Sequence, residues 1–257
     1  MKVTVLGSGG WIPTAQQETA CYMIESGGVL ILLDAGTGLS NLGRYREVLQ
    51  QHETIHIVLS HYHMDHIIGL SFLPVFCRNH TVWIHGPGEP AYPKGAGKIL
   101  SDFFCEPFSS SPVEDLAERL FFADYHEGLF NVGNVTFKAF RQSHSHPSFG
   151  LKVENSLFYA TDTGVSQQTF ERAAGVSLML HECWTLEPAD DPYHSSLEQI
   201  IQKLAPNTGG GRLGLIHRNP RWGNQDRAAA KSRIASAKEK INGWQIELVE
   251  DHQVFQL

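Results

Sequence analysis

The apolar positions of the chain fall into short runs separated by turns rich in Gly, Ser and Pro. Runs of this kind that contain β-branched and aromatic residues are typical of β-strands. Gly27-Gly28 lies between two of them and favours a tight hairpin turn. The predicted strands are Lys2–Leu6, Cys21–Glu25, Val29–Asp34, His56–Ser60, Thr81–His85, Arg119–Ala123, Val135–Arg141, Phe149–Glu154, Ser156–Ala160, Ser177–His181 and Arg212–His217, and two more strands are expected at the end of the chain.

Other segments place apolar residues at helical spacing. They are Leu39–Gln50, His66–Phe76, Gln167–Ala174, Ser195–Leu204 and Asn224–Lys240. Pro74 is expected near the end of the second helix, because proline interrupts a helix interior. Ser195 and Glu198 have the spacing of a capping box at the start of the fourth. Glu89–Pro112 is rich in Pro, Gly and Ser and is expected to be irregular, as a lid or substrate loop.

Strands outnumber helices, and meanders of strands alternate with single helices along the whole chain. This order predicts an α/β fold in which two mixed β-sheets pack face to face and helices cover their outer faces, a four-layer αββα sandwich. The sequence contains no repeat of solenoid length and no clear linker. We therefore expect one domain over residues 1–257, made of two similar halves, approximately 1–140 and 141–257.

The composition limits the class of protein. With 42% hydrophobic and 18% charged residues, the chain has the balance of a globular domain. Its formal net charge of -7 argues against the broad basic surface of a non-specific nucleic-acid binder. The chain has no apolar run of about 20 residues, so no membrane partner is expected. The opening residues 1–7 do not form a secretory signal, which favours a cytoplasmic location. The sequence leaves a homodimer open.

The cysteines and tryptophans are expected in structural roles. Cys21, Cys77, Cys105 and Cys183 are too far apart to form a Cys-x-x-Cys pair, so reduced and mostly buried thiols are expected. Trp11, Trp83, Trp184 and Trp222 line either the core or a pocket, and the core is the better expectation for large aromatic side chains.

Histidine is unusually frequent, with fourteen residues, and its densest cluster is Ser60-His61-Tyr62-His63-Met64-Asp65-His66. Alternation along an extended strand end puts His61 and His63 on the same side. The turn that follows can bring Asp65 and His66 to a second point nearby. Imidazole and carboxylate groups are ligands that Zn²⁺ prefers. The cluster therefore predicts a metal site.

This motif resembles the His-x-His-x-Asp-His signature of the metallo-β-lactamase superfamily, and further family positions follow in the same order. Asp34, at the end of an early strand, matches an aspartate that orients the metal loop. His144 has the family spacing to Gly150 and is favoured over His146, which is then a pocket or supporting residue. The turn at Asp162 and the late strand ending in His217 supply the remaining matches.

The resemblance implies a two-metal site and its chemistry. One zinc would bind His61, His63 and His144, the other would bind Asp65, His66 and His217, and Asp162 would bridge the two. A water shared by both metals would become a nucleophile near neutral pH, and Asp65 could also orient or deprotonate it. Ligand sets of this type also accept Mn²⁺ or Fe.

Two later motifs resemble the ribonuclease Z branch of the superfamily. They are Leu180-His181-Glu182-Cys183-Trp184 and Tyr193-His194-Ser195-Ser196. The resemblance implies that Glu182 and His194 form a catalytic pair beside the scissile phosphate, where the histidine protonates a leaving alkoxide. The alternative is that Glu182 is a surface charge and that His194-Ser195 only caps a helix.

The substrate is narrowed by what the chain lacks. Ribonuclease Z holds tRNA with a long basic arm, and the short stretch between His144 and Asp162 leaves no room for one. The chain is also similar to the cyclic-phosphate phosphodiesterase of phosphonate breakdown, but it lacks that family's cysteine-rich structural zinc site. Small or nucleotide phosphodiesters are therefore favoured over RNA. Arg218 and Arg221 either bind a phosphate or are simply exposed.

We predict from these features a dinuclear zinc-dependent hydrolase that acts as a phosphodiesterase. His63 stands where the oxygen-reducing diiron branch has glutamate, which favours hydrolysis over redox chemistry. A lactonase or thioester hydrolase on the same site is the main alternative, because that chemistry needs less from Glu182 and His194. A non-catalytic metal-binding protein is the remaining class.

Overall fold

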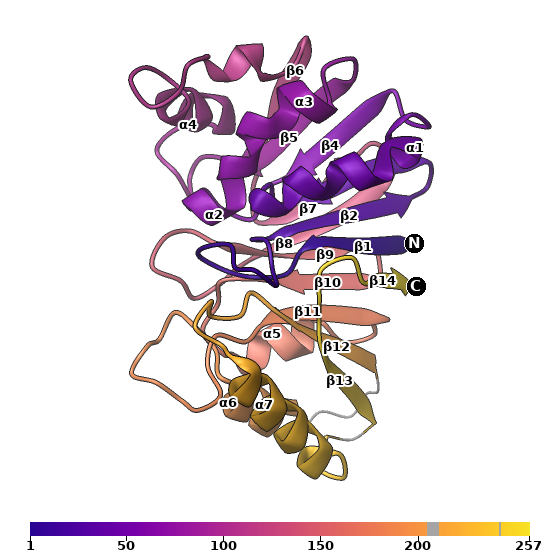
Figure 1. Cartoon of the computed structure of the whole chain (residues 1–257), viewed down its shortest axis with the longest axis vertical. Coiled ribbons are helices and arrows are strands. Elements are labelled where there is room, and N and C mark those ends of the chain that lie inside the picture. Colours follow the sequence, from indigo (N-terminus) through magenta and orange to yellow (C-terminus); the bar gives the residue numbers. More distant parts are fainter. Residues whose placement is uncertain (205–210, 242) are drawn as a thin grey trace.

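The computed structural model describes residues 1–204, 211–241 and 243–257. Within these residues the chain forms two mixed β-sheets of seven strands each, stacked face to face. Helices cover the outer face of each sheet, and the two ends of the chain lie side by side (Figure 1). The predicted αββα sandwich is confirmed, and we retain one domain as our interpretation.

The first sheet has the order β14-β1-β2-β3-β4-β5-β6. Its strands are β1 (Lys2–Gly7), β2 (Cys21–Ser26), β3 (Val29–Leu33), β4 (Thr54–Val58), β5 (Thr81–Pro87), β6 (Arg119–Tyr125) and β14 (Val254–Gln256). Strands β3 to β6 run parallel, while β14, β1, β2 and β3 pair antiparallel. Gly27 and Gly28 both have positive φ and close the β2–β3 hairpin as predicted.

The second sheet mirrors this arrangement, with the order β13-β12-β11-β10-β9-β8-β7. Its strands are β7 (Gly128–Val132), β8 (Val135–Arg141), β9 (Phe149–Val153), β10 (Leu157–Ala160), β11 (Leu178–Glu182), β12 (Gly211–Ile216) and β13 (Trp244–Leu248). Strands β10 to β13 are parallel and the others antiparallel. The chain crosses from the first sheet to the second after β6, and its last strand, β14, belongs to the first sheet again.

Helices form the outer layers. Over the first sheet lie η1 (Thr37–Tyr45), α1 (Arg46–Leu49), α2 (Met64–Ile67), η2 (Ile68–Phe72), α3 (Leu73–Phe76), α4 (Ala96–Phe103) and η3 (Val113–Leu116). Over the second lie α5 (Gln167–Arg172), α6 (Leu197–Leu204) and α7 (Asn224–Ala237). Three apolar clusters hold the layers together, one between the sheets and one beneath each helical layer. Central strands such as β3 and β11 are buried on both faces, which explains their continuous apolar sequence.

Several helix predictions need correction. The helix expected at Leu39–Gln50 begins at Thr37 and is mostly a 3-10 helix, and His66–Phe76 is three short helical pieces that begin at Met64. Pro74 lies in the first turn of the short helix α3, where its missing N–H is tolerated. Within Glu89–Pro112, α4 is an ordered helix that the flanking Pro and Gly concealed.

One strand was not predicted from the sequence. In β7, Leu129 is exposed and the adjacent Phe130 is half-buried. Because two neighbouring apolar residues point to opposite faces, the alternation of apolar and polar residues that indicates a strand is absent from the sequence. The cysteines follow their prediction, since all four are free and three of them are buried. The expectation that the tryptophans lie in the core is wrong, because Trp11 is exposed and Trp83, Trp184 and Trp222 are only half-buried. Trp184 and Trp222 line a pocket, which was the other alternative.

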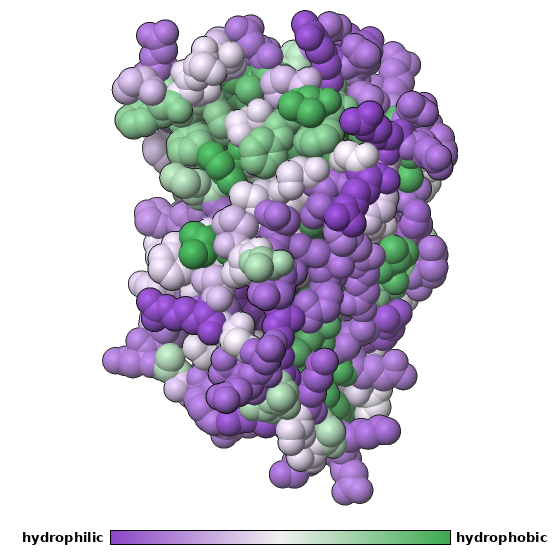
Figure 2. All heavy atoms as spheres, in the orientation of Figure 1, coloured by the Kyte–Doolittle hydropathy of each residue, from purple (hydrophilic) through white to green (hydrophobic). Residues whose placement is uncertain are grey.

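Figure 2 shows that hydrophilic side chains cover most of the face seen in Figure 1, and that apolar side chains gather over α3 and α4. Val75 of α3 and Phe108 beyond α4 are among the exposed large apolar residues. In the part of the chain that the structure describes, no helix combines the length and the apolar character needed to cross a membrane.

Candidate metal centre

The histidines and aspartates that were predicted as metal ligands follow the carboxyl ends of strands from both sheets. His61, His63 and His66 follow β4, while Asp162 follows β10 and His217 follows β12. The parallel strands of each sheet end at the same edge, and the sandwich brings the two edges together. Side chains that are far apart in the sequence therefore meet in one place.

The structure groups all seven predicted metal ligands. The nitrogen and oxygen atoms within each group lie within 4.8 Å of one another. The groups are His61, His63, His144 and Asp162; Asp65, His66 and His217; and Asp162, His194 and His217. The first two match the two predicted metal positions, and Asp162 belongs to more than one group, as a bridging residue would.

The distances within the groups suit a divalent metal. Nδ1 of His63 lies 3.2 Å from Nε2 of His144, and Nε2 of His66 lies 3.3 Å from Nε2 of His217. Two nitrogens at about 2.0–2.1 Å from one tetrahedral zinc are separated by roughly 3.4 Å. Nε2 of His61 is buried and has no hydrogen-bond partner in the described part of the chain. A metal would satisfy this nitrogen, so the residues fit the group that the fold implies.

Asp162 lies between the two groups. Its Oδ2 is 2.9 Å from Nε2 of His66 and 3.1 Å from Nε2 of His217, and its Oδ1 is 3.7 Å from Nε2 of His144. Asp162 and His217 both have positive φ, a conformation that non-glycine residues rarely adopt and that recurs at functional sites. At these two positions the backbone conformation accompanies a carboxylate and an imidazole that point into the cluster.

A buried hydrogen-bond network orients the histidine loop. Oδ2 of Asp34 lies 2.7 Å from Nδ1 of His66 and accepts hydrogen bonds from the hydroxyls of Ser60 and Tyr159. Oδ1 of Asp34 accepts the backbone N–H of Ser60 at 2.6 Å. With Nδ1 of His66 held in this way, Nε2 faces the cluster, which is how ligating histidines are usually supported. The sequence predicted Asp34, but Ser60 and Tyr159 were not recognised.

The electrostatics differ between the two groups. Burial lowers the pKa of His63 to about 4 and also lowers the pKa values of His61 and His144, so these imidazoles are neutral as metal binding requires. Burial alone would lower the pKa of His217, but the charge of Asp162 and the hydrogen bonds that Asp65 and Glu182 accept from the imidazole outweigh burial, and the pKa is raised to about 10. The carboxylates therefore concentrate negative charge around His66 and His217.

Glu182 and His194 form the pair that the sequence predicted. Oε2 of Glu182, which is fully buried, lies 2.9 Å from Nδ1 of His194. Burial lowers the pKa of His194, but the hydrogen bond and charge of Glu182 outweigh burial and raise it above its ordinary value. Glu182 is not a surface charge, so that alternative is wrong. The helix cap is made instead by Ser196 and Gln199, one residue later than predicted, and Ser195 donates to the backbone of Thr163.

Other predicted residues separate into those near the cluster and those away from it. His146 is exposed and lies outside the cluster, with its Nδ1 3.4 Å from Nε2 of His63. The prediction that Arg218 is a phosphate ligand or exposed is wrong, because it is fully buried and donates to Leu215 O and to Glu250. Arg221 is exposed.

Two residues beside the cluster were not recognised from the sequence as part of it. The ring of Trp184 stacks on His194, with centroids 4.8 Å apart, and on His217, with centroids 5.7 Å apart. Gly10 lies so close to His217 that a Cβ atom there would be 2.5 Å from its Cε1. The glycine-rich segment Gly7-Ser8-Gly9-Gly10 predicts a tight turn near the metal pocket, in agreement with its place here, but no sequence pattern identifies His217 as the neighbour of Gly10.

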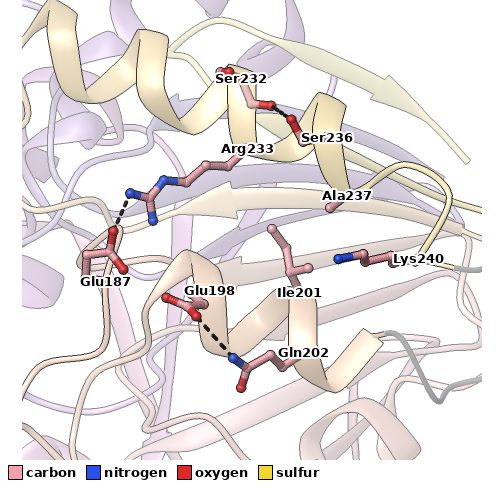
Figure 3. A pocket seen from close by; sticks show the side chains of 9 residues that line it. All are labelled: Glu187, Glu198, Ile201, Gln202, Ser232, Arg233, Ser236, Ala237 and Lys240. Carbon is pink, nitrogen blue, oxygen red and sulfur yellow. Dashed lines mark hydrogen bonds and ion pairs between the residues drawn. The ribbon is translucent and has the colours of Figure 1, made fainter.

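A cavity of about 550 Å³ lies away from this cluster, between α6 and α7 (Figure 3). Two of its charged residues, Glu187 and Arg233, form an ion pair, as Figure 3 shows. None of the cluster's histidines or aspartates lines it. This cavity is therefore separate from the candidate metal centre.

Comparison with known proteins agrees with this geometry. A family model described as "Beta-lactamase superfamily domain" matches residues 30–218, a span that includes every member of the cluster. Ribonuclease Z of Thermococcus sibiricus is 26% identical, with 93% of this chain and 92% of that protein covered.

Two solved structures show the same fold. The metallo-β-lactamase fold protein YhfI from Bacillus subtilis matches with a TM-score of 0.75 and 20% identity, over 99% of this chain and 98% of that one. A diphosphatase from the PhnP family matches with a TM-score of 0.70 and 18% identity, over 100% and 97%.

Proposed function

This chain belongs to the metallo-β-lactamase superfamily of hydrolases, and we propose that it binds two zinc ions and hydrolyses a phosphodiester. The fold family implies a divalent metal, and the donor groups described above could hold two. Bound there, the metals would supply a water nucleophile near neutral pH and polarise the phosphate oxygens. In this proposal the surrounding side chains hold the metals, orient the water and protonate the leaving group.

The proposed ligands fall into two sets. His61, His63 and His144 would hold one metal with neutral imidazoles, and Asp65, His66 and His217 would hold the other with an added negative charge. Asp162 supports both positions at once. Asp65 also accepts the backbone N–H of Trp11 at 2.7 Å, which fixes its carboxylate beside His217. In our proposal one oxygen of Asp65 orients the attacking water.

The observation that favours a phosphodiester is the pairing of Glu182 with His194. The carboxylate fixes Nδ1 of the imidazole and raises its pKa, so Nε2 can donate a proton toward the cluster. A phosphodiester releases an alkoxide, which is a poor leaving group unless it is protonated. Lactone and thioester hydrolysis depend less on such a donor. The pair therefore supports phosphodiester chemistry over the alternative hydrolyses.

The net charge of the chain and the names of similar proteins narrow the size of the proposed substrate. The net charge of -7 disfavours a large polyanion such as folded tRNA. The similar ribonuclease Z supports phosphodiester chemistry, while the similar diphosphatase has a name that implies a small phosphate compound. We propose a small or nucleotide phosphodiester, with RNA as the less favoured substrate.

The first test is hydrolysis of bis(p-nitrophenyl) phosphate by the zinc-loaded protein, beside a chromogenic lactone and a β-lactam. We expect clear turnover of the diester, with a loss of about 100-fold in His194→Ala. His126→Ala, which removes an exposed histidine outside the cluster, is the matched control. Turnover of only the lactone or the β-lactam would overturn the phosphodiesterase proposal and leave a hydrolase with another substrate.

A further inference from the structure

The loop between β1 and β2 reaches the candidate metal centre with its backbone. The backbone N–H of Trp11 donates to Oδ2 of Asp65 at 2.7 Å, and the same oxygen lies 3.2 Å from Nε2 of His217. The neighbouring Gly10 packs against the imidazole of His217, where a Cβ atom would be 2.5 Å from Cε1. The loop therefore contacts two proposed ligands of one metal position.

Trp11 has a backbone conformation that large side chains rarely adopt. Its φ is 66°, and the backbone N–H of Ile12 donates to the carbonyl of Gly10 at 2.9 Å across it. A hydrogen bond of this span around a residue with positive φ is the pattern of the strained form of the γ-turn. Such strain persists only where surrounding contacts fix it, and it is concentrated at functional sites.

Hydrogen bonds to the end of the chain fix this loop. One oxygen of Asp251 accepts the backbone N–H and the hydroxyl of Ser8, at 2.9 and 2.7 Å, and the other oxygen accepts the backbone N–H of Glu18 at 2.7 Å. Nε2 of Gln17 also donates to the hydroxyl of Ser8, at 2.6 Å. Contacts on both sides of the turn therefore hold Trp11 in its strained conformation.

The side chain at this strained position is exposed, and other large apolar side chains near the cluster are exposed with it. Trp11 and Ile12 are 56% and 49% exposed. Met64, which lies between two proposed ligands in the sequence, is 61% exposed. Tyr193, whose ring centroid lies 6.2 Å from that of His144, is 43% exposed. Exposed apolar side chains gathered around one site mark a surface that binds a ligand.

The geometry of the proposed reaction decides which part of the substrate Trp11 can reach. In an in-line displacement the attacking water and the leaving oxygen lie on opposite sides of the phosphorus. In our proposed function Asp65 orients the water and His194 protonates the leaving oxygen. Because Trp11 is hydrogen-bonded to Asp65, it is anchored on the side of the water. The group within its reach is therefore the ester group that the phosphorus retains.

We propose that Trp11 determines specificity by stacking on a planar aromatic ring in the retained ester group of the substrate. This inference rests on the proposed function, because Asp65 and His194 define the two sides of the phosphate. An exposed indole is stabilised when a planar ring covers it, and stacking of this kind accepts rings of different chemistry, nucleobases included. Because the backbone of the loop is already fixed, little of this stabilisation is lost in ordering it.

Three chromogenic diesters with the same leaving group test this inference. They are the methyl, benzyl and cyclohexylmethyl esters of 4-nitrophenyl phosphate, whose retained alcohols have similar acidity and therefore similar effects on the phosphorus. We expect the zinc-loaded protein to favour the benzyl ester over the methyl ester in kcat/KM by about tenfold, as suits one stacked ring. The cyclohexylmethyl ester, which is apolar but not planar, should gain clearly less.

A binding measurement gives a readout that needs no turnover. Benzylphosphonate and methylphosphonate carry the same anionic group and differ by the ring. Calorimetry with the zinc-loaded protein should show that benzylphosphonate binds about tenfold more tightly.

Variants assign the preference to the indole. Trp11→Ala should lower kcat/KM for the benzyl ester about tenfold more than for the methyl ester, whereas Trp11→Phe should keep part of the preference. Leu129→Ala, which removes an exposed apolar side chain of β7 outside the cluster, should keep all of it. Zinc content, measured in parallel, should be the same in Trp11→Phe and the unaltered protein, because the backbone N–H that Asp65 accepts is retained.

The outcomes are distinct. If none of the esters is hydrolysed, the phosphodiesterase proposal fails, while a preference for benzylphosphonate that Trp11→Ala abolishes would still support the aromatic contact. If the methyl and benzyl esters are hydrolysed with equal kcat/KM, or if Trp11→Ala keeps the preference, the role of Trp11 is wrong while the phosphodiesterase stands. An equal gain for the cyclohexylmethyl ester would overturn the requirement for a planar ring.

Discussion

Nδ1 of His194 lies 2.9 Å from Oε2 of Glu182, while the other oxygen of that carboxylate accepts the backbone N–H of Thr163 at 2.8 Å. Thr163 directly follows Asp162, so one buried carboxylate ties the proposed proton donor to the turn of the proposed bridging ligand. The two hydrogen bonds of Glu182 thereby help to set the distance between the proposed proton donor and the proposed metal position.

The first prediction concerns this carboxylate. Glu182→Gln should lower kcat for aryl phosphodiesters by about 10- to 100-fold, because the amide no longer raises the pKa of His194. The loss should be larger for a phenyl than for a p-nitrophenyl leaving group, since the poorer leaving group needs the proton more. Kinetics on both substrates, with zinc content measured in parallel, test this. Equal losses on both, or a loss of zinc that accounts for them, would argue for a purely structural role.

The second prediction concerns the metals. Chelation should abolish turnover and lower the melting temperature by about 10 °C, because a ligand that binds only the folded chain stabilises it by several kcal/mol. Zinc added back should restore both, at two equivalents per chain. His61→Ala should lower the zinc content, whereas His126→Ala should not. A plateau at one equivalent in the unaltered protein would contradict the dinuclear site.

Much of the candidate metal centre could be predicted because its residues lie next to recognisable strand ends. His61 to His66 form one continuous motif, and Asp162 and His217 each end an apolar run. The parallel strands carry them to one edge. The choice of His144 over His146 also agrees with the structure, which groups only His144 with the other donors.

The rest depends on contacts between segments with no shared pattern. Arg218 follows a proposed ligand directly, and only the fold shows that the returning chain end buries it against Glu250. Tyr159 looks like a core strand residue, and only the packing of the sheets brings its hydroxyl to Asp34. Such long-range pairings leave no local signal in a single sequence.

The third prediction uses the close approach of Gly10 to His217. Gly10→Ala would place a Cβ atom 2.5 Å from the imidazole, so the ring must shift away from Asp65 and Asp162. We expect zinc affinity at this position to fall by about 10- to 100-fold, measured by competition with a chromogenic chelator. Gly223→Ala is the control, since its nearest neighbour would be 3.8 Å away. Equal zinc affinity in both variants would show that the loop after β1 moves to accommodate the new methyl group without disturbing His217.

The fourth prediction is a pH dependence that does not involve the metal ligands. Burial and the nearby His56 lower the pKa of His85 to about 4, against roughly 6.5 in an unfolded chain. Above that unfolded value both states are neutral. As the pH falls from about 6.5 to 4, the unfolded chain takes up the proton first, so stability decreases.

His85→Gln should therefore flatten the decrease in unfolding free energy over this window, by at most about 3 kcal/mol. Urea titrations between pH 7 and pH 4, with chelator present throughout, measure the difference between the variant and the unaltered protein. His126→Gln, an exposed substitution, should follow the unaltered protein. A His85→Gln curve parallel to both would contradict the burial argument.

The fifth prediction compares two neighbouring arginines. Arg218 is fully buried, with Nη1 donating to Leu215 O at 2.7 Å and Nη2 lying 3.3 Å from Glu250, whereas Arg221 is exposed. Arg218→Leu removes the charged donor to Leu215 O, which keeps the backbone N–H of Val249 at 3.1 Å, and should lower the unfolding free energy by about 1–3 kcal/mol. Glu250 keeps Arg227 as its partner, at 2.7 Å, which limits the loss.

Arg221→Leu should change the unfolding free energy by less than about 0.5 kcal/mol, as is usual for an exposed side chain. Urea unfolding of the zinc-loaded variants at pH 7 gives both values under one condition. Because Arg218 holds Leu215 within β12, just before His217, its loss should also weaken zinc binding, while Arg221→Leu should not. If the two variants are equally stable, the buried pair contributes specificity of packing and little free energy.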